Sequence, residues 1–92
     1  MTNNSNITVY TKDNCVYCEK AKALLKGLDL SFTEKKYGKD FNTPEELFEA
    51  VGKKVRTMPQ IMIDNELVGG YNQLVEYYNN KGLVNFKGEL NK

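Results

Sequence analysis

Residues 7–18 read Ile-Thr-Val-Tyr-Thr-Lys-Asp-Asn-Cys-Val-Tyr-Cys, and this stretch decides the fold of the chain. Its first five residues alternate β-branched and aromatic side chains, a pattern typical of a β-strand. Polar residues 12–14 predict a loop. From Cys18 onward, apolar residues recur at helical spacing, so we expect an amphipathic helix of about three turns that ends near Gly27. The stretch therefore predicts a strand, a short loop and a Cys-x-x-Cys pair at the start of a helix.

The chain that follows predicts a second strand and a second helix. Residues 30–37 have the composition of a strand, with Leu30 and Phe32 on one face. Residues 43–46, Thr-Pro-Glu-Glu, form a capping box with proline at the first helical position. A helix is therefore expected to begin there and to end at Gly52. Its buried stripe is expected to comprise Leu47, Phe48 and Val51.

A hairpin is predicted next. Residues 60–63, Gln-Ile-Met-Ile, and residues 66–68, Glu-Leu-Val, are separated by Asp64-Asn65, a pair typical of a tight turn. Gly69-Gly70 closes the hairpin. Strands and helices thus alternate along the first part of the chain and a hairpin follows. This order predicts an α/β fold with a mixed β-sheet and helices packed on it, the first two strands being parallel.

A last helix and the limits of the domain complete the prediction. Asn72 is a suitable N-cap for a helix that stops near Gly82. The whole chain has 92 residues, which suits a single domain. We expect residues 1–6 to be a disordered leader, residues 7–82 to form the domain, and residues 83–92 to be a C-terminal extension.

The composition excludes several classes of function. The formal net charge is +1, which argues against a dedicated nucleic-acid or membrane-surface binder. The chain has no histidine, so it has neither a Cys-His nucleophile pair nor an imidazole metal ligand. Its two cysteines cannot fill a four-sulfur zinc site. Chemistry must therefore come from those two sulfurs, or from carboxylates, lysines and tyrosines.

The position of the two cysteines favours redox chemistry. Unsatisfied N–H groups and the positive end of the helix dipole favour a thiolate at Cys15. Cys18 lies one turn further along the helix, within reach of Cys15, and Lys12 adds a positive charge nearby. Two other interpretations are half of a zinc knuckle, whose second half is missing, and two unrelated buried cysteines. The strand–loop–helix context makes both less favourable.

Four features together resemble the glutaredoxins of the thioredoxin-fold superfamily. They are Thr11-Lys12 leading into Cys15-Val16-Tyr17-Cys18, with Val16 where the family usually has proline; Thr57-Met58-Pro59; Gly69-Gly70; and Tyr71-Asn72-Gln73-Leu74. The match spans residues 7 to about 80, and within it the sequence is most similar in pattern to small bacteriophage glutaredoxins. The resemblance implies a thioredoxin-like fold, with a four-stranded mixed β-sheet flanked by three or more helices.

The resemblance also implies a role for each matched residue. Cys15 would be the exposed nucleophile and Cys18 the resolving thiol. Pro59 would follow a cis peptide bond, which turns the backbone of Met58 toward the sulfurs. The helix that begins at Asn72 would offer free N–H groups to the γ-glutamyl carboxylate of glutathione, with Asn72 in place of the family's usual acidic residue. The implied glutathione-binding residues are Lys12, Tyr17, Arg56, Thr57, Met58, Pro59, Gly70, Tyr71, Asn72 and Gln73.

The implied activity is that of a glutathione-dependent thiol–disulfide oxidoreductase, with glutathione as co-substrate and no metal. Its substrates would be protein disulfides and protein–glutathione mixed disulfides. One alternative is a thioredoxin served by a flavoprotein reductase, against which the missing tryptophan before Cys15 and the Gly69-Gly70 pair argue. Another is a dimer that binds an iron–sulfur cluster through Cys15 of each chain and two glutathiones. The replacement of proline by Val16 makes that alternative less remote.

Partners and location are expected from the same reasoning. Glutathionylated proteins and ribonucleotide reductase are both consistent with the family as targets, and no nucleic acid or membrane partner is expected. The chain is expected to be a monomer. No export signal or membrane span is recognised in the sequence, so a cytoplasmic location is expected, which for a phage-encoded protein means the host cytosol.

Overall fold

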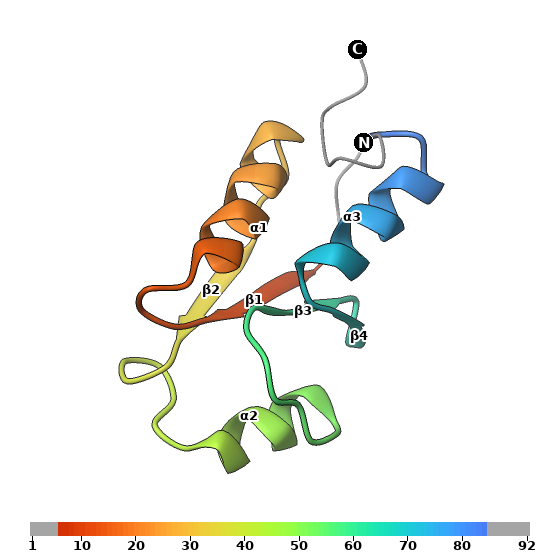
Figure 1. Cartoon of the computed structure of the whole chain (residues 1–92). Coiled ribbons are helices and arrows are strands. Elements are labelled where there is room, and N and C mark those ends of the chain that lie inside the picture. The colour runs from red at the N-terminus through yellow and green to blue at the C-terminus, as the bar shows by residue number, and fades with distance from the viewer. Residues whose placement is uncertain (1–5, 85–92) are drawn as a thin grey trace.

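A sheet with the strand order β2-β1-β3-β4 runs through the centre of the protein in the computed structural model, which describes residues 6–84 (Figure 1). The strands are β1 (Ile7–Thr11), β2 (Thr33–Lys36), β3 (Gln60–Ile63) and β4 (Glu66–Gly69). The helices are α1 (Val16–Gly27), α2 (Pro44–Val51) and α3 (Tyr71–Asn80). β1 pairs in parallel with β2 and antiparallel with β3, and β3 pairs antiparallel with β4. The predicted four-stranded mixed sheet is confirmed.

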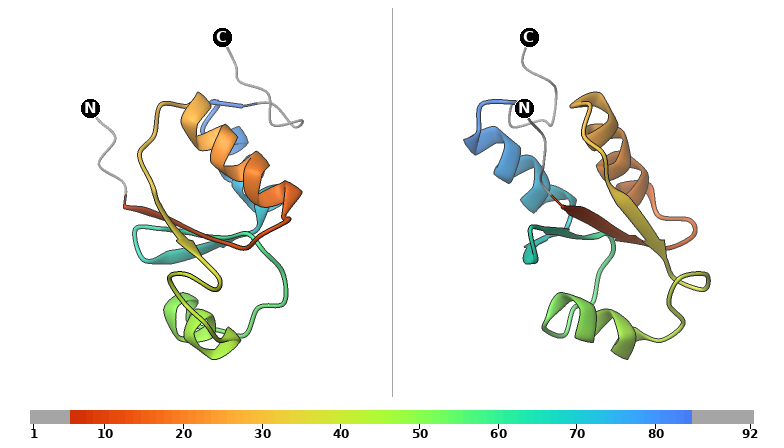
Figure 2. Two further views of the ribbon diagram at one scale, coloured as in Figure 1. Left: turned by 90° about the vertical axis from the view of Figure 1, so that its left-hand side faces the viewer. Right: turned by 180° about the vertical axis from the view of Figure 1, so that it is seen from behind.

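The helices cover both faces of this sheet. α1 and α3 lie side by side on one face and α2 lies on the other, as both views of Figure 2 show. Successive strand residues point to opposite faces, so the alternation in β1 feeds two separate cores. The main core lies under α1 and α3 and includes Val9, Leu25 and Leu74. A smaller core under α2 is formed by Tyr10, Phe41, Leu47 and Val51.

The second strand is shorter than the sequence suggests. The prediction of residues 30–37 was too long, because only Thr33–Lys36 forms β2. The preceding residues complete the end of α1 instead: the N–H of Leu30 donates to the carbonyl oxygen of Leu25 at 3.0 Å, and Asp29 takes a positive φ of 60°. Leu30 and Phe32 still pack against the main core, although neither belongs to a strand.

The remaining elements follow their local signals closely. Thr43 caps α2, because its Oγ1 accepts a hydrogen bond from the N–H of Glu46, and Gly52 ends the helix with a φ of 88°. In the predicted stripe of α2, Leu47 and Val51 are buried, whereas the neighbouring Phe48 is only half-buried. The hairpin turn at Asp64-Asn65 is present, with a positive φ at both residues.

The last described residue belongs to the main core. Val84 is fully buried in the main core, and its carbonyl oxygen accepts a hydrogen bond from the side chain of Asn79 at 2.9 Å. The chain therefore contributes to the core beyond the predicted boundary at Gly82. The expected leader, apart from Asn6, and the extension from residue 85 onward lie outside the described residues. None of the helices between residues 6 and 84 is long and apolar enough to span a bilayer.

A polar network attaches α1 to the sheet. The buried Thr11 donates from Oγ1 to the carboxylate of Glu34 at 2.7 Å, and Nζ of Lys22 lies 3.1 Å from the same oxygen. Lys22 also pairs with Glu19 at 3.0 Å. The hydrogen bond from Thr11 and the charge of Lys22 outweigh partial burial and hold the pKa of Glu34 below its usual value. One carboxylate thus connects β1, β2 and α1.

Glu34→Gln is expected to reduce the loss of stability in acid. A carboxyl whose pKa is lower in the folded state stabilises the fold above its unfolded pKa of about 4.3, and this contribution is lost as the pH falls through the folded value. Urea unfolding near neutral pH and at about pH 3 should therefore show a smaller drop in unfolding free energy for the variant than for the wild type. Glu49→Gln, at an exposed carboxylate of α2, is the control and should behave as the wild type does. Equal drops in all three proteins would contradict the prediction.

Candidate active site

The two cysteines form a disulfide at the start of α1. Cys15 is the N-cap of this helix, and its Sγ accepts a hydrogen bond of 3.1 Å from the backbone N–H of Cys18. Cys15 is half-buried, whereas Cys18 is fully buried against the core. A cysteine at an N-cap places its sulfur where the unsatisfied helical N–H groups point, which favours the thiolate once the disulfide is reduced. The pair can thus open and close with only Cys15 facing the solvent.

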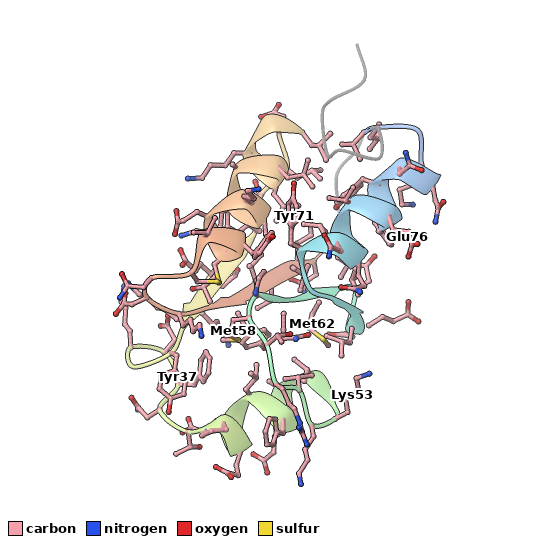
Figure 3. The ribbon with its side chains drawn as sticks, in the orientation of Figure 1. Tyr37, Lys53, Met58, Met62, Tyr71 and Glu76 are labelled. Carbon is pink, nitrogen blue, oxygen red and sulfur yellow. A yellow bond between two sulfur atoms is a disulfide. The ribbon has the colours of Figure 1, made fainter. Side chains whose placement is uncertain are left out.

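The loop before β3 faces this disulfide. The Met58–Pro59 peptide bond is cis, as the resemblance implied, and the carbonyl oxygen of Met58 lies 3.6 Å from Sγ of Cys15. The side-chain amide of Gln60 donates to the carbonyl oxygen of Thr57 at 2.8 Å and holds the loop in shape. In Figure 3 the side chain of Met58 lies between the sheet and α2. The backbone of Thr57-Met58 is therefore the nearest wall on that side of the sulfurs.

A pocket of about 230 Å³ opens beside the disulfide. Every residue of its lining belongs to the set that the sequence predicted for glutathione: Tyr17, Thr57, Met58, Pro59, Gly70, Tyr71, Asn72 and Gln73. Three segments that are far apart in the sequence meet here, namely the first turn of α1, the loop before β3 and the start of α3. We call this hollow the disulfide pocket.

The start of α3 differs in one respect from the prediction. The N-cap is Gly70 and the helix begins at Tyr71, so the assignment of Asn72 as N-cap was wrong. The reason is Gln73, whose side-chain oxygen accepts a hydrogen bond from the N–H of Gly70 at 3.0 Å, so the helix is capped two residues earlier. Asn72 is exposed within the first turn and still lines the disulfide pocket. Gly69, with a φ of 122°, provides the turn that leads into this helix.

Two tyrosines form one side of the disulfide pocket, and a lysine outside its lining lies over both rings. The rings of Tyr17 and Tyr71 lie 5.8 Å apart between their centroids. Nζ of Lys20 lies 5.3 Å from the ring centroid of Tyr17 and 6.0 Å from that of Tyr71, within the range of cation–π attraction. Figure 3 shows Tyr71 in the space between α1 and α3. This contact fixes the first turn of α1 against the start of α3.

Lys12 and Arg56 lie outside the disulfide pocket. Both line a second hollow of about 220 Å³ on the α2 side of the sheet, which shares Thr57 and Met58 with the disulfide pocket. Its other lining residues are mainly apolar and include Tyr37, Leu47 and Phe48. The two predicted cations are thus adjacent to each other but separated from the start of α3 by the loop before β3. Lys53 and Lys54, which precede Val55 in the chain, line neither hollow.

Sequence reasoning did not identify Lys20 as a residue near the site. The signal was present, because Tyr17 and Lys20 are three residues apart and share one face of α1. No group of three or more metal-ligating side chains of the histidine, cysteine or carboxylate type occurs in the described part of the chain.

Comparison with known proteins gives a consistent result. The family model described as glutaredoxin matches residues 7–68. Glutaredoxin 3 of Escherichia coli strain K12 is 39% identical over 70 residues, which cover 76% of this chain and 82% of that protein. Glutaredoxin 1 of Rickettsia conorii is also 39% identical over 70 residues, covering 76% of this chain and 69% of that protein. The solution structure of reduced Escherichia coli glutaredoxin superposes with a TM-score of 0.71 at 28% identity, covering 82% of this chain and 94% of that chain.

Proposed function

Since the chain belongs to the glutaredoxin family and is a thiol–disulfide oxidoreductase, we propose that glutathione is the reductant of this protein and that Cys15 and Cys18 have different roles in its reaction. The observation that carries this proposal is the disulfide pocket, which lies between the start of α3 and Met58, whose carbonyl oxygen is 3.6 Å from Sγ of the half-buried Cys15. Glutaredoxins as a family use glutathione as a reductant. A pocket near the half-buried Cys15 that combines two tyrosine rings with several polar groups is suited to a small peptide-like thiol.

With a protein–glutathione mixed disulfide, Cys15 alone completes the reaction. Its thiolate attacks the glutathione sulfur, the bond between that sulfur and the protein sulfur breaks, and the protein leaves as a thiolate that takes a proton from water. The enzyme then holds glutathione in a mixed disulfide with Cys15. A second glutathione thiolate attacks the bound glutathione sulfur, which forms glutathione disulfide and restores the Cys15 thiolate. No histidine is required, because the helix start stabilises the thiolate directly.

With a protein disulfide, Cys18 takes part as well. Cys15 attacks one sulfur of the substrate and forms a mixed disulfide with the protein. The Cys18 thiolate then attacks Sγ of Cys15, which releases the reduced protein and leaves the Cys15–Cys18 disulfide seen in the structure. Two glutathiones supply the two electrons that reduce this bond. The full burial of Cys18 supports its role as an internal resolving thiol, since only Cys15 is open to a protein substrate.

The lining of the disulfide pocket suggests how glutathione is held. The backbone of Met58 would pair with the cysteinyl unit, because its carbonyl oxygen already faces Cys15. The γ-glutamyl carboxylate would bind at the N-terminus of α3, where the N–H groups of the first turn are available. Asn72 would accept a hydrogen bond from the ligand's ammonium without adding a charge. Tyr17 and Tyr71 would pack against the carbon skeleton of the ligand.

The glycyl carboxylate would bind on the other side of Met58. Lys12 and Arg56 both line the hollow that adjoins Thr57 and Met58 there, and both are exposed. A glutathione laid across the loop before β3 would therefore have its two ends in two different hollows. This arrangement supports both cations as ligands of one carboxylate, with weak individual contributions because each is solvated.

The compartment and the assembly state belong to the same proposal. A dithiol that must be returned to the reduced state suits a cytoplasm rich in glutathione. Each chain carries a complete cysteine pair, so a monomer suffices for the reaction. The protein substrates would be glutathionylated proteins or proteins with an accessible disulfide, such as ribonucleotide reductase.

The choice of electron donor tests the proposal. The oxidised protein is mixed with a disulfide substrate and NADPH, and either glutathione with glutathione reductase or thioredoxin reductase is added. We expect NADPH oxidation at a high rate with glutathione and only the background rate with thioredoxin reductase, because the disulfide pocket is shaped for a small thiol. S-methylglutathione, which cannot react, should compete with glutathione, whereas S-methylcysteine should not. Efficient turnover with thioredoxin reductase and none with glutathione would refute the proposal.

A further inference from the structure

A hollow that adjoins the disulfide pocket lies between α1 and α3. Its volume is about 520 Å³, and its walls include Tyr17 and Lys20 of α1 and Asn72, Glu76, Asn79 and Asn80 of α3. We call it the helix groove. It shares Tyr17, Tyr71 and Asn72 with the disulfide pocket, so the two hollows meet at the tyrosine pair. A chain held at Cys15 can therefore continue into the helix groove.

The charges along the helix groove are arranged unevenly. Lys20 lies over the tyrosine rings and, among residues 6–84, makes no ion pair. It is the cation at the end nearest the disulfide. Glu76, labelled in Figure 3, follows Asn72 by one turn along α3 and stands further from the cysteines. The groove thus presents a positive charge close to the reacting sulfur and a negative charge beyond it.

Both substrate classes of the proposed function bring a polypeptide to Cys15. In a protein–glutathione mixed disulfide, glutathione occupies the disulfide pocket and the hollow beside Lys12, so the protein segment needs another path. The helix groove offers amide side chains at Asn79 and Asn80, beyond the residues assigned to glutathione, and these can pair with an extended backbone through both donors and acceptors. Such a polar, open groove suits a peptide better than an apolar ligand.

We propose that the helix groove receives the polypeptide segment that flanks the substrate cysteine, and that Lys20 selects segments with an acidic residue beside that cysteine. This inference rests on the proposed function, because it assigns a binding site to the protein half of a mixed disulfide whose other half is glutathione. Charge complementarity gives the preference its direction, since an acidic side chain next to the cysteine meets Lys20 while a basic one is repelled. Lys20 is thus a specificity-determining residue.

Two glutathionylated peptides test this inference. Each contains a single cysteine, flanked by aspartates in one peptide and by lysines in the other, and the readout is the ratio of kcat/KM for the acidic to the basic peptide. Using the change in this ratio between variants cancels the intrinsic reactivity of each peptide. Lys20→Glu is expected to lower the ratio by about fivefold to tenfold, since the charge beside the segment is reversed. Lys20→Met, which keeps the hydrocarbon stem against the tyrosine rings, should lower it by a smaller factor.

Lys26→Glu is the matched control, because Lys26 lies in the last turn of the same helix and the variant has the same net charge as Lys20→Glu. Its ratio should equal that of the wild type. An unchanged ratio in Lys20→Glu, or the same change in Lys26→Glu, would overturn the inference. Failure of the wild type to reduce either peptide with glutathione would instead refute the proposed function, so the two failures are distinguishable.

Discussion

Cys15→Ser is expected to abolish reduction of both substrate classes, lowering kcat/KM by about 10³-fold or more, because a serine hydroxyl cannot replace a thiolate in attack on sulfur. The structure gives the reason for choosing this sulfur: Cys15 is the half-buried N-cap, and it accepts the N–H of Cys18. The measurement is glutathione-coupled reduction of a glutathionylated peptide and, separately, of a protein disulfide.

Cys18→Ser is the matched variant, since it removes the buried member of the same pair. It should keep the reduction of the glutathionylated peptide, which needs Cys15 alone, and lose most of the reduction of the protein disulfide, which needs an internal resolving thiol. Activity retained in Cys15→Ser, or mixed-disulfide reduction lost in Cys18→Ser, would show that the assigned roles are wrong.

Leu74→Ala is expected to destabilise the fold by about 2–5 kcal/mol, the usual cost of deleting a fully buried leucine side chain. Leu74 is fully buried in the main core, and it lies in the first turns of α3, directly after the residues that line the disulfide pocket. A small single domain has a total stability of about 5–15 kcal/mol, so this loss is a large fraction of it. The measurement is urea unfolding at neutral pH, followed by circular dichroism.

Leu83→Ala provides the comparison for the same chemical change. The Leu83 side chain is 42% exposed, and its truncation should change the unfolding free energy by only about 0.5 kcal/mol. Equal effects of the two substitutions would mean that burial in the main core does not decide the cost. The expected difference depends only on where the two leucines lie.

Local signals predicted most of the fold. The Cys15-x-x-Cys18 motif after an alternating strand, the capping box at Thr43 and the Asp64-Asn65 turn each depend on neighbours within a few residues, and the structure confirms all three. The cis bond before Pro59 was implied by the family resemblance, because no local pattern distinguishes it from an ordinary proline at the start of a strand.

Errors arose where a distant or competing contact decides the structure. Leu30 and Phe32 have the spacing of a strand, but the end of α1 binds Leu30 through the carbonyl oxygen of Leu25 before pairing with β1 can begin. Asn72 has the chemistry of an N-cap. However, the side-chain oxygen of Gln73 accepts a hydrogen bond from the N–H of Gly70, so Gly70 becomes the N-cap instead. Propensity alone cannot rank such competing hydrogen bonds.

In the candidate site, too, local signals and tertiary contacts decide different features. All eight residues that line the disulfide pocket belong to the glutathione-binding set that the family resemblance implied, but the resemblance did not divide that set between two hollows. Lys12 and Arg56 lie on the α2 side because β1 and the loop before β3 carry them there, which only the packed sheet reveals. The pairing of Lys20 with Tyr71 requires α1 and α3 to be neighbours, and this is again a tertiary fact.

The division of the apolar interior by the sheet has a consequence for how the protein can vary. Both cysteines and α3 belong to the side of the main core, whereas α2 rests on its own small cluster around Tyr10 and Leu47. Substitutions at distant sites without shared partners have nearly additive effects. The apolar cluster under α2 can therefore be repacked with little effect on the redox helix, except at Thr57 and Met58, which the two hollows share.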